Sequence, residues 1–393
     1  MIPALAEIST ILATLHSLAQ NPPELLARFL ILVVVNHRLD ASNADKSDNL
    51  ATLQLLKDPE TSLLPLRLAW IDAASEGLEL PVKGGGVGLA RRIGLDLALT
   101  RLDSANPDAI LVCLDADTLV RPEYLPAIVQ HFELNRSGGA ILHFLHQSVP
   151  SPAEQSAIDR YELFLRSYVF GLKLAGSPYA FHSVGSAMAC RARSYLKIGG
   201  MNNRSAGEDF YFLQQLSRTV GVAQVQGTVV YPSSRASHRV PFGTGRSVSR
   251  MLDGGEGELS FYHTSCFRIL GDWLALVSSS PDSACEALLK LAGAISPDLS
   301  DYLHQIRFCE VWPKLQRNNP GPTALLSAFN GWFDGLKTMK LIHHLSSVAY
   351  PRCEPEITLP DLLHWGGLEV VGGIAGALEV LRSQQLGQDY RPA

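Results

Sequence analysis

The chain has 393 residues, of which 46% are hydrophobic and 18% charged. This composition is that of a globular protein and excludes intrinsic disorder, while the length favours two domains or one enlarged domain. With 33 basic and 38 acidic residues the formal net charge is −5. That balance argues against a general nucleic-acid-binding protein, because such proteins carry an excess of basic residues.

The six cysteines are scattered and include no CxxC pair. This spacing predicts neither a zinc site nor a disulfide framework, and a reducing cytosol is the expected environment. The N-terminal sequence MIPALAEIST has no basic region and no small-residue cleavage site, so no secretion signal is expected. The longest apolar stretches are too short or too interrupted to span a bilayer. We therefore expect a soluble cytoplasmic protein without a transmembrane segment, and peripheral contact with the inner face of the membrane stays open.

The N-terminal third alternates between strand-like and helix-like patterns. Residues 1–28 have apolar side chains at helical spacing and predict a helical lead-in, whereas the continuous apolar run over 29–35 predicts a strand buried on both faces. The following patterns predict a helix over 49–58, a strand over 64–75, a helix over 88–102 and a strand over 109–120. This alternation is typical of an α/β fold with a mostly parallel sheet.

Polar side chains follow these predicted strands directly. They are Asn36, Asp72, Asp115 and Asp117. Ligands of parallel sheets bind outside the carboxyl ends of the strands. We therefore expect a binding site at this edge of the sheet.

The rest of the chain changes character near residues 246–256, in a glycine-rich stretch. Before it, the patterns predict a helix over 152–176, a strand and a short helix over 186–200, a helix over 207–221 and a strand over 223–234. After it, the segments are helical with almost no strand signal. We therefore expect an α/β domain over 1–250 and a helical C-terminal region over 251–393.

Asp115 and Asp117 stand one residue apart at the end of a hydrophobic strand, in ILVCLDADTLV. In extended backbone, residues i and i+2 project to the same side, so the two carboxylates repel each other unless a cation binds there. Mg²⁺ or Mn²⁺ held by one or two carboxylates and by substrate phosphates fits this arrangement. A solvated turn that caps the next helix is the alternative, and a bare DxD does not decide between them.

A second acidic pair, Glu208 and Asp209, precedes a strongly apolar helix. Acidic residues are common at helix N-termini, because the helix dipole favours them there. A carboxylate held near an acceptor hydroxyl can instead take its proton as a general base. The pattern alone leaves both interpretations open.

A third group lies in RASHRVPFGTGRSVSR, whose glycines allow backbone N–H groups to approach an anion. Arg239, Arg246 and Arg250 are candidates to face a diphosphate, and His238 is a candidate to bind a metal or a phosphate. A glycine-rich surface loop with solvated arginines is the alternative. The stretch KGGGVGLARR is neither a P-loop nor GxGxxG, and only its Arg91 is a candidate for a phosphate or base contact.

In this order the motifs resemble those of the family-2 glycosyltransferases. That family has a buried strand ending in a polar turn, a strand closing on Asp with a nearby Ser, and a helix opening with Ala-Arg-Asn-x-Gly. The segments ILVVVNHR, LAWIDAAS and ARRIG match these elements here. The DxD strand follows as CLDADTLV, and later come a Gly-Gly and an acidic pair in IGGMNNRSAGEDFYF. The resemblance covers about residues 30–245 and leaves the helical C-terminal third outside.

The resemblance implies a nucleotide-sugar-binding GT-A fold and a metal-dependent, inverting transfer of a sugar to an acceptor hydroxyl. Two departures are the missing Pro-Thr-Tyr-Asn after the first strand and Arg92 in place of the customary Asn. The Gln-x-x-Arg-Trp motif of processive synthases is absent too, so a single addition is expected. The implied partners are a divalent cation (Mn²⁺ or Mg²⁺), a UDP- or GDP-linked sugar donor, and a glycan or lipid-linked acceptor.

Carried over residue by residue, the resemblance also implies roles on the donor side. Asp72 would hydrogen-bond the nucleobase, and Asn36 would contact the nucleotide sugar at the same edge of the sheet. Asp115 would contact the ribose or the metal shell. Arg91 would contact the nucleotide sugar, and Arg246 would lie on the leaving-group side.

For the metal and the reaction, the resemblance implies that Asp117 binds the cation, with Asp115 and His238 as further candidates. Asp209 would be the catalytic base, and Glu208 beside it would shape the site. From chain order alone, the candidates for the acceptor pocket are Tyr179, His182 and Ser186.

Two other classes of protein stay open. A sugar-1-phosphate nucleotidyltransferase also uses an α/β nucleotide-binding sheet, but it would carry a glycine-rich signature after the first strand, whereas NHRLDASN has no glycine. A non-catalytic GT-A-like scaffold would be expected to lose Asp117 or Asp209, and both are present. The metal-dependent glycosyltransferase is therefore the leading hypothesis.

Overall fold

The computed structural model describes residues 1–103, 106, 108–235, 244–252, 259–369 and 372–387. The chain divides into two compact units. The first holds Met1–Ile158 and Ser183–Asp253, and the second holds Asp159–His182 and Gly254–Gly387. The first unit contains strands and helices and the described part of the second is helical, so the predicted α/β class with a helical C-terminal region is confirmed.

The first unit contains two groups of hydrogen-bonded strands. Its described strands are β1 (Ile2–Ala4), β2 (Leu30–Asn36), β3 (Arg67–Ala73), β4 (Ile110–Cys113), β5 (Leu119–Val120), β6 (Gly139–Phe144), β7 (Met188–Arg191) and β8 (Val222–Tyr231). The order β1-β2-β3 is parallel throughout, as predicted. The order β4-β7-β6-β8-β5 is mixed, because only β6 and β8 run parallel within it.

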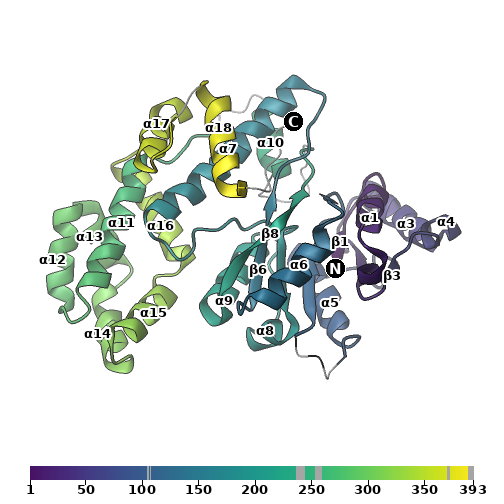
Figure 1. Cartoon of the computed structure of the whole chain (residues 1–393), viewed down its shortest axis with the longest axis horizontal. Coiled ribbons are helices and arrows are strands. Elements are labelled where there is room, and N and C mark those ends of the chain that lie inside the picture. Colours follow the sequence, from purple (N-terminus) through teal and green to yellow (C-terminus); the bar gives the residue numbers. More distant parts are fainter. Residues whose placement is uncertain (104–105, 107, 236–243, 253–258, 370–371, 388–393) are drawn as a thin grey trace. The chain divides into compact units, whose positions relative to one another are not determined.

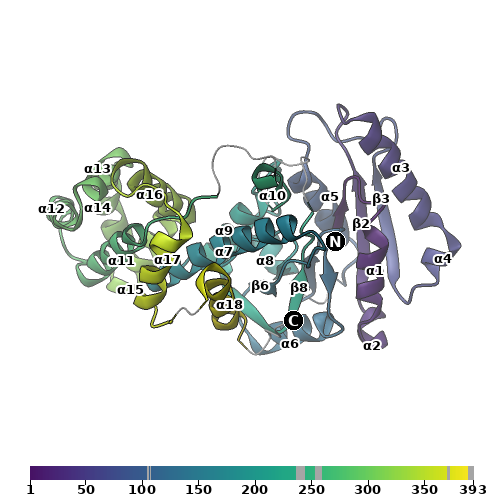
Figure 2. The ribbon, with the colours of Figure 1, turned by 90° about the horizontal axis from the view of Figure 1, so that it is seen from above.

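Helices cover these strands (Figure 1). The described helices of this unit are α1 (Ile11–Ala19), α2 (Pro23–Leu26), α3 (Asn43–Lys57), α4 (Pro59–Ser62), α5 (Val87–Leu99), α6 (Tyr124–Leu134), α8 (Ala192–Lys197), α9 (Glu208–Val220) and α10 (Thr244–Leu252). Helix α5 packs against the buried apolar residues of β1 and β2 (Figure 2). Helix α6 packs on β8. Helix α9 contacts β6, β8 and α5, which brings its first turn toward the end of α5 that carries Arg91.

The N-terminal residues form a strand, and the predicted helical lead-in over 1–28 is wrong at its start. The Met1 nitrogen donates to the Val112 carbonyl at 2.8 Å, and the Leu114 N–H donates to the Met1 carbonyl at 3.1 Å. Strand β1 therefore lies between β2 and β4 and joins the two groups of strands. Three residues are too few for a pattern to show, which is why the sequence did not reveal this strand.

Because β1 comes first, the strand over 30–36 is the second strand of the chain and not, as the resemblance implied, the first. Strand β3, near whose end Asp72 lies, is the third and is at the edge of the order β1-β2-β3. Strand β6 was not predicted either, since its six buried residues show no alternation that distinguishes a strand from a helix.

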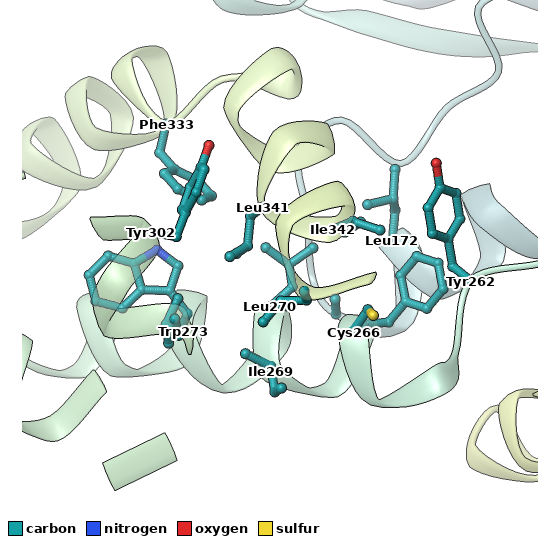
Figure 3. Close-up of a cluster of buried hydrophobic side chains, with 14 of the residues drawn as sticks. Leu172, Tyr262, Cys266, Ile269, Leu270, Trp273, Tyr302, Phe333, Leu341 and Ile342 are labelled. Atoms are coloured by element: carbon teal, nitrogen blue, oxygen red, sulfur yellow. The ribbon is translucent and has the colours of Figure 1, made fainter. Parts of the chain in front are cut away.

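The second unit is a helical bundle around one apolar core. Most of α7 (Pro152–Leu174) belongs to it, and its other described helices are α11 (Thr264–Ser279), α12 (Cys285–Ile295), α13 (Pro297–Gln305), α14 (Phe308–Asn318), α15 (Pro322–Trp332), α16 (Gly335–Val348), α17 (Pro355–Trp365) and α18 (Gly373–Leu386). Figure 3 shows Leu270 of α11 beside Leu341 and Ile342 of α16, with Trp273 one turn further along α11. None of the helices in the described ranges combines the length and the apolarity that crossing a bilayer requires.

A disulfide joins Cys285 at the start of α12 to Cys309 in α14, with a Cα–Cα distance of 5.4 Å. The expectation of no disulfide is therefore wrong. The two cysteines are 24 residues apart and meet only because α12 and α14 pack together, and this pairing cannot be deduced from spacing. The described cysteines Cys113, Cys190, Cys266 and Cys353 are free.

Replacing both bridged cysteines in a Cys285→Ser/Cys309→Ser variant should lower the free energy of unfolding by about 3 kcal/mol, since the open chain regains the entropy of a loop of this length. Thermal unfolding with and without a reducing agent measures the effect. The wild-type Tm should fall on reduction and the variant's should not move. An equal Tm for the reduced and oxidised wild-type protein would contradict the stabilising role of this bridge.

Candidate functional site

The acidic residues singled out in the sequence lie on two elements of the first unit. Asp115 and Asp117 are in the connection between β4 and β5, where the Thr118 N–H donates to the Asp115 carbonyl at 3.1 Å. Glu208 and Asp209 form the first turn of α9, which begins after Gly207 in the left-handed conformation at φ +69°. Because Asp115 and Asp117 lie in a turn rather than in extended backbone, each carboxylate has its own partner.

The Arg91 side chain on α5 holds the first of these elements against the second. It is 2% exposed, and its guanidinium donates to Asp115 Oδ1 at 2.6 Å, to Glu208 Oε1 at 3.1 Å and to the Gly185 carbonyl at 2.9 Å. Burial alone would lower the pKa of Arg91, but the negative charges of Asp115 and Glu208 outweigh it and raise the pKa above its usual value. The group is therefore a permanent cation that fixes two carboxylates.

Two glycines make room for this arrangement. A Cβ atom on Gly185 would lie 2.3 Å from the Arg91 guanidinium, and one on Gly88 would lie 2.3 Å from the Arg204 carbonyl. The Gly88 N–H donates to that same carbonyl at 3.1 Å, so the start of α5 is held against the loop that leads into α9. Gly88 of the stretch KGGGVGLARR thus allows a close approach of two backbone segments.

Asp117 has a different arginine as its partner. Arg235, which follows β8, donates to Asp117 Oδ2 at 3.2 Å and also to the carboxylate of Glu7, a residue that is 6% exposed. The Gln147 side chain donates to the Asp117 carbonyl at 2.8 Å and to the Tyr231 carbonyl at 2.7 Å, which ties the same turn to the end of β8.

The sequence reading missed Arg235 and Glu7. Arg235 opens the arginine-rich stretch that was singled out, so a signal for it existed. Glu7 gave none, because it was placed in a helix.

Asp209 differs from the other three acidic residues. Asp115, Asp117 and Glu208 each contact an arginine, whereas the contact described for the Asp209 carboxylate is with the Phe210 N–H, at 2.7 Å. Burial, together with the negative charge of Glu208, raises the pKa of Asp209 to about 7. A carboxyl group with this pKa exchanges its proton near neutral pH, as a general base requires.

The donor set at the turn suits a hard divalent cation. Carboxylate oxygens are the ligands that Mg²⁺ and Mn²⁺ prefer, and such ions use one or two carboxylates and complete their shell with phosphate oxygens and water. Asp117, whose side chain is partly exposed, and Asp115 can supply these one or two carboxylate ligands. Among the described residues, no cluster of three or more His, Cys, Asp or Glu side chains is arranged to hold a metal ion. His238 lies outside the described residues.

Two of the residues predicted on the nucleotide side, Asn36 and Asp72, are hydrogen-bonded within the fold. The Asn36 side chain is buried and donates to the carbonyls of Ala4 and Val34. Asp72 accepts from the Ala74 and Ser75 N–H groups and from the Ser75 hydroxyl. Burial alone would raise the pKa of Asp72, but the hydrogen bonds from Ser75 lower it below its usual value. Their nucleotide-binding roles stay predictions.

The remaining candidates are spread over the two units. Arg246 is in α10, whose first residue Thr244 contacts His146 Nε2 at 3.3 Å. His146 precedes Gln147, whose side chain donates to the Asp117 carbonyl. Ser186 is buried beside Gly185.

Tyr179 and His182 belong to the second unit, where Tyr179 donates to the Asn330 carbonyl at 2.6 Å and His182 Nε2 contacts Gln385 Oε1 at 3.1 Å. Their roles toward an acceptor stay predictions, as does the leaving-group role of Arg246.

Comparison with known protein families adds to this geometry. Residues 110–252 match the model of a family described as glycosyl transferase family group 2. The resemblance to family-2 glycosyltransferases is confirmed. The matched range holds both acidic pairs, Gly185 and Arg235, as well as residues 159–182 of the helical unit, while Arg91 and the part of the helical unit after residue 252 lie outside it. A comparison with curated protein sequences found no match.

Several solved structures are similar to the chain at low identity. TarS 1–349 from S. aureus in complex with UDP-GlcNAc has 13% identity and a TM-score of 0.40, with 99% of this chain and 92% of that chain covered. The mannosyltransferase PcManGT from Pyrobaculum calidifontis in complex with GDP-Man and Mn²⁺ has 13% identity and a TM-score of 0.38, with 84% and 86% covered.

The Arg91→Lys substitution tests whether Arg91 joins the two acidic motifs. A lysine ammonium cannot reach three acceptors on different elements, so the variant should lose about 3 kcal/mol of unfolding free energy, measured by denaturant titration. The neighbouring Arg92→Lys is the matched control, because the Arg92 side chain is 42% exposed, pairs with Asp96 within one helix and reaches Asn203 only at 3.4 Å. It should change stability by about 0.5 kcal/mol or less. Equal effects of the two substitutions would contradict the role given to Arg91.

Proposed function

We propose that the chain is an inverting glycosyltransferase that moves a hexosyl group from a nucleotide-sugar donor to an acceptor hydroxyl, one addition at a time, in a GT-A-type site. The observation that carries the proposal is the division among the four carboxylates. Three are neutralised by arginines, and the fourth, Asp209, keeps a pKa of about 7. The family match over residues 110–252 supports the donor class, since it covers the elements that hold these groups.

Asp209 acts as the general base. The acceptor hydroxyl attacks the anomeric carbon from the face opposite the leaving nucleoside diphosphate, and its proton passes to the Asp209 carboxylate. Glu208 cannot take this role, because its carboxylate is buried and bound to Arg91. Instead, Glu208 fixes the start of α9 and raises the basicity of Asp209 through its charge.

The DxD turn holds the donor diphosphate. Asp117 and Asp115 are the residues that would hold a divalent cation, Mn²⁺ or Mg²⁺, and when bound such an ion neutralises charge on the departing diphosphate. Arg91 holds Asp115 so that its carboxylate cannot rotate away, and Gln147 holds the backbone of Asp117. The UDP- or GDP-linked nature of the donor and the glycan or lipid-linked acceptor belong to the same proposal.

Calorimetric titration with UDP, GDP and dTDP, each with and without Mn²⁺, tests the donor class. At least one nucleoside diphosphate should bind, and Mn²⁺ should tighten its binding, because the ion and the diphosphate share ligands. Asp117→Asn should abolish most of the Mn²⁺ effect. Absence of metal-enhanced binding for every nucleotide would refute the proposal.

Asp209→Asn tests the base. The amide cannot accept a proton, so transfer should fall by about 10²-fold or more, while donor binding in the calorimeter stays within about twofold of wild type. In the wild type, kcat/KM should decline below pH 7 as Asp209 becomes protonated. Transfer at an undiminished rate by this variant would remove Asp209 from the mechanism.

The same variant has a stability signature. Because the folded pKa of Asp209 lies above its ordinary value, the folded protein holds a proton that the unfolded chain releases, and the free energy of unfolding falls as the pH rises from about 4 to about 7. The amide of the Asp209→Asn variant does not titrate, so the variant's free energy of unfolding does not fall for this reason. At pH 8 the Tm of Asp209→Asn should therefore exceed that of the wild type by a few degrees, and a lower Tm would argue against a raised pKa.

A further inference from the structure

Both carboxylates of the DxD turn are already paired with a cation of the protein. Asp115 accepts from Arg91 on α5 at 2.6 Å, and Asp117 accepts from Arg235 after β8 at 3.2 Å. The two arginines come from different elements of the first unit, α5 and the segment that follows β8, and each pairs with a different carboxylate of the turn. A divalent ion that arrives at Asp117 therefore meets a carboxylate whose charge a guanidinium offsets.

Arg235 is anchored where it stands. Its guanidinium also contacts the carboxylate of Glu7, a buried residue that accepts from the Thr10 hydroxyl as well. Moving the arginine away would take an ion-pair partner from this buried carboxylate, which is costly. The Ser234 hydroxyl next to it donates to the Gln147 carbonyl, so the backbone that carries Arg235 is tied down too. Hence a metal ion at Asp117 has to share the space with a fixed positive charge.

Arg235 makes a bare divalent ion at Asp117 less well neutralised. Its guanidinium is paired with both the Asp117 and the Glu7 carboxylates, so it offsets negative charge that the ion would otherwise meet. The described residues offer no third His, Cys, Asp or Glu ligand that completes a metal site with them. A diphosphate would supply the missing oxygens and the missing negative charge, and Arg235 would attract that same diphosphate.

We propose that Arg235 makes the binding of a divalent cation at Asp117 depend on a nucleoside diphosphate. It opposes the cation when the cation comes alone, and it favours the cation and the diphosphate when they come together. The inference rests on the proposed function, because it assumes that the DxD turn takes a metal–nucleotide pair.

The test uses the full chain and Mn²⁺, whose free-ion EPR signal disappears on binding, with UDP and GDP as the nucleotide probes. In the wild type, Mn²⁺ alone should bind weakly, and the nucleotide should lower the Kd for Mn²⁺ at least tenfold. We call this change in the Kd the nucleotide effect. Arg235→Met should bind Mn²⁺ alone several-fold more tightly, because the repelling charge is gone, and the nucleotide effect should shrink by about tenfold.

Three further variants make the result specific. Arg235→Lys keeps the charge and should keep the nucleotide effect. Glu7→Gln removes a negative charge and leaves Arg235 beside Asp117, so it should weaken the binding of Mn²⁺ alone, in the direction opposite to Arg235→Met; it also provides the test if Arg235→Met does not fold. Arg193→Met is the matched control, since Arg193 forms an exposed ion pair with Asp108 at 3.0 Å near the amino end of β4, and it should change neither quantity.

The outcomes separate the inference from the proposed function. If the wild type shows the nucleotide effect but Arg235→Met binds Mn²⁺ alone more weakly and keeps that effect, Arg235 only positions Asp117 and the inference is wrong. If Glu7→Gln tightens the binding of Mn²⁺ alone, the charge argument is wrong. If the wild type binds neither nucleotide and Mn²⁺ has no effect, the proposed function fails and the inference fails with it.

Discussion

A single buried guanidinium, that of Arg91, holds together the elements that carry the candidate site. It reaches from α5 to the DxD turn, to the first turn of α9 and to the backbone at Gly185. No other side-chain type carries a charge that persists at every relevant pH and offers donors in several directions from one fixed plane. The acidic residues can therefore approach one another without repelling the elements apart, and the geometry of the site is set before any ligand binds.

This constraint divides the carboxylates by function. Those in contact with arginines are held as charged acceptors with fixed orientations, which suits binding of a cation and a diphosphate. Asp209 lies beside them without an arginine contact among the described residues, and burial together with the negative charge of Glu208 raises its pKa to about 7. The charged form of Asp209 therefore lowers the stability of the folded protein, as is common for groups that activity requires.

The sequence predicted the parts of the site that depend on local pattern and order. The helix that carries Arg91 and the helix that begins at Glu208 were both placed correctly within a few residues. The strand predicted over 109–120 was right at its start but ends at Cys113, so Asp115 and Asp117 lie in a turn and not in extended backbone. Other features depend on contacts between distant segments, which leave no local trace. Strand β1 is too short to show a period, Glu7 meets Arg235 across 228 positions, and Cys285 meets Cys309 only through helix packing. The hydrogen bond from Arg91 to the Gly185 carbonyl likewise joins segments that are distant in the sequence.

The central claim is that the DxD turn and the start of α9 form one nucleotide-sugar site. A crystal structure of the full chain soaked with Mn²⁺ and the nucleoside diphosphate that it binds tests this most directly, because the anomalous signal of Mn²⁺ locates the ion without a model. We predict a peak within coordinating distance, about 2.2 Å, of an Asp117 carboxylate oxygen, with the diphosphate against it and Asp209 facing the position of the anomeric carbon. A nucleotide bound away from Asp115 and Asp117, or an ion that touches neither, would contradict the account.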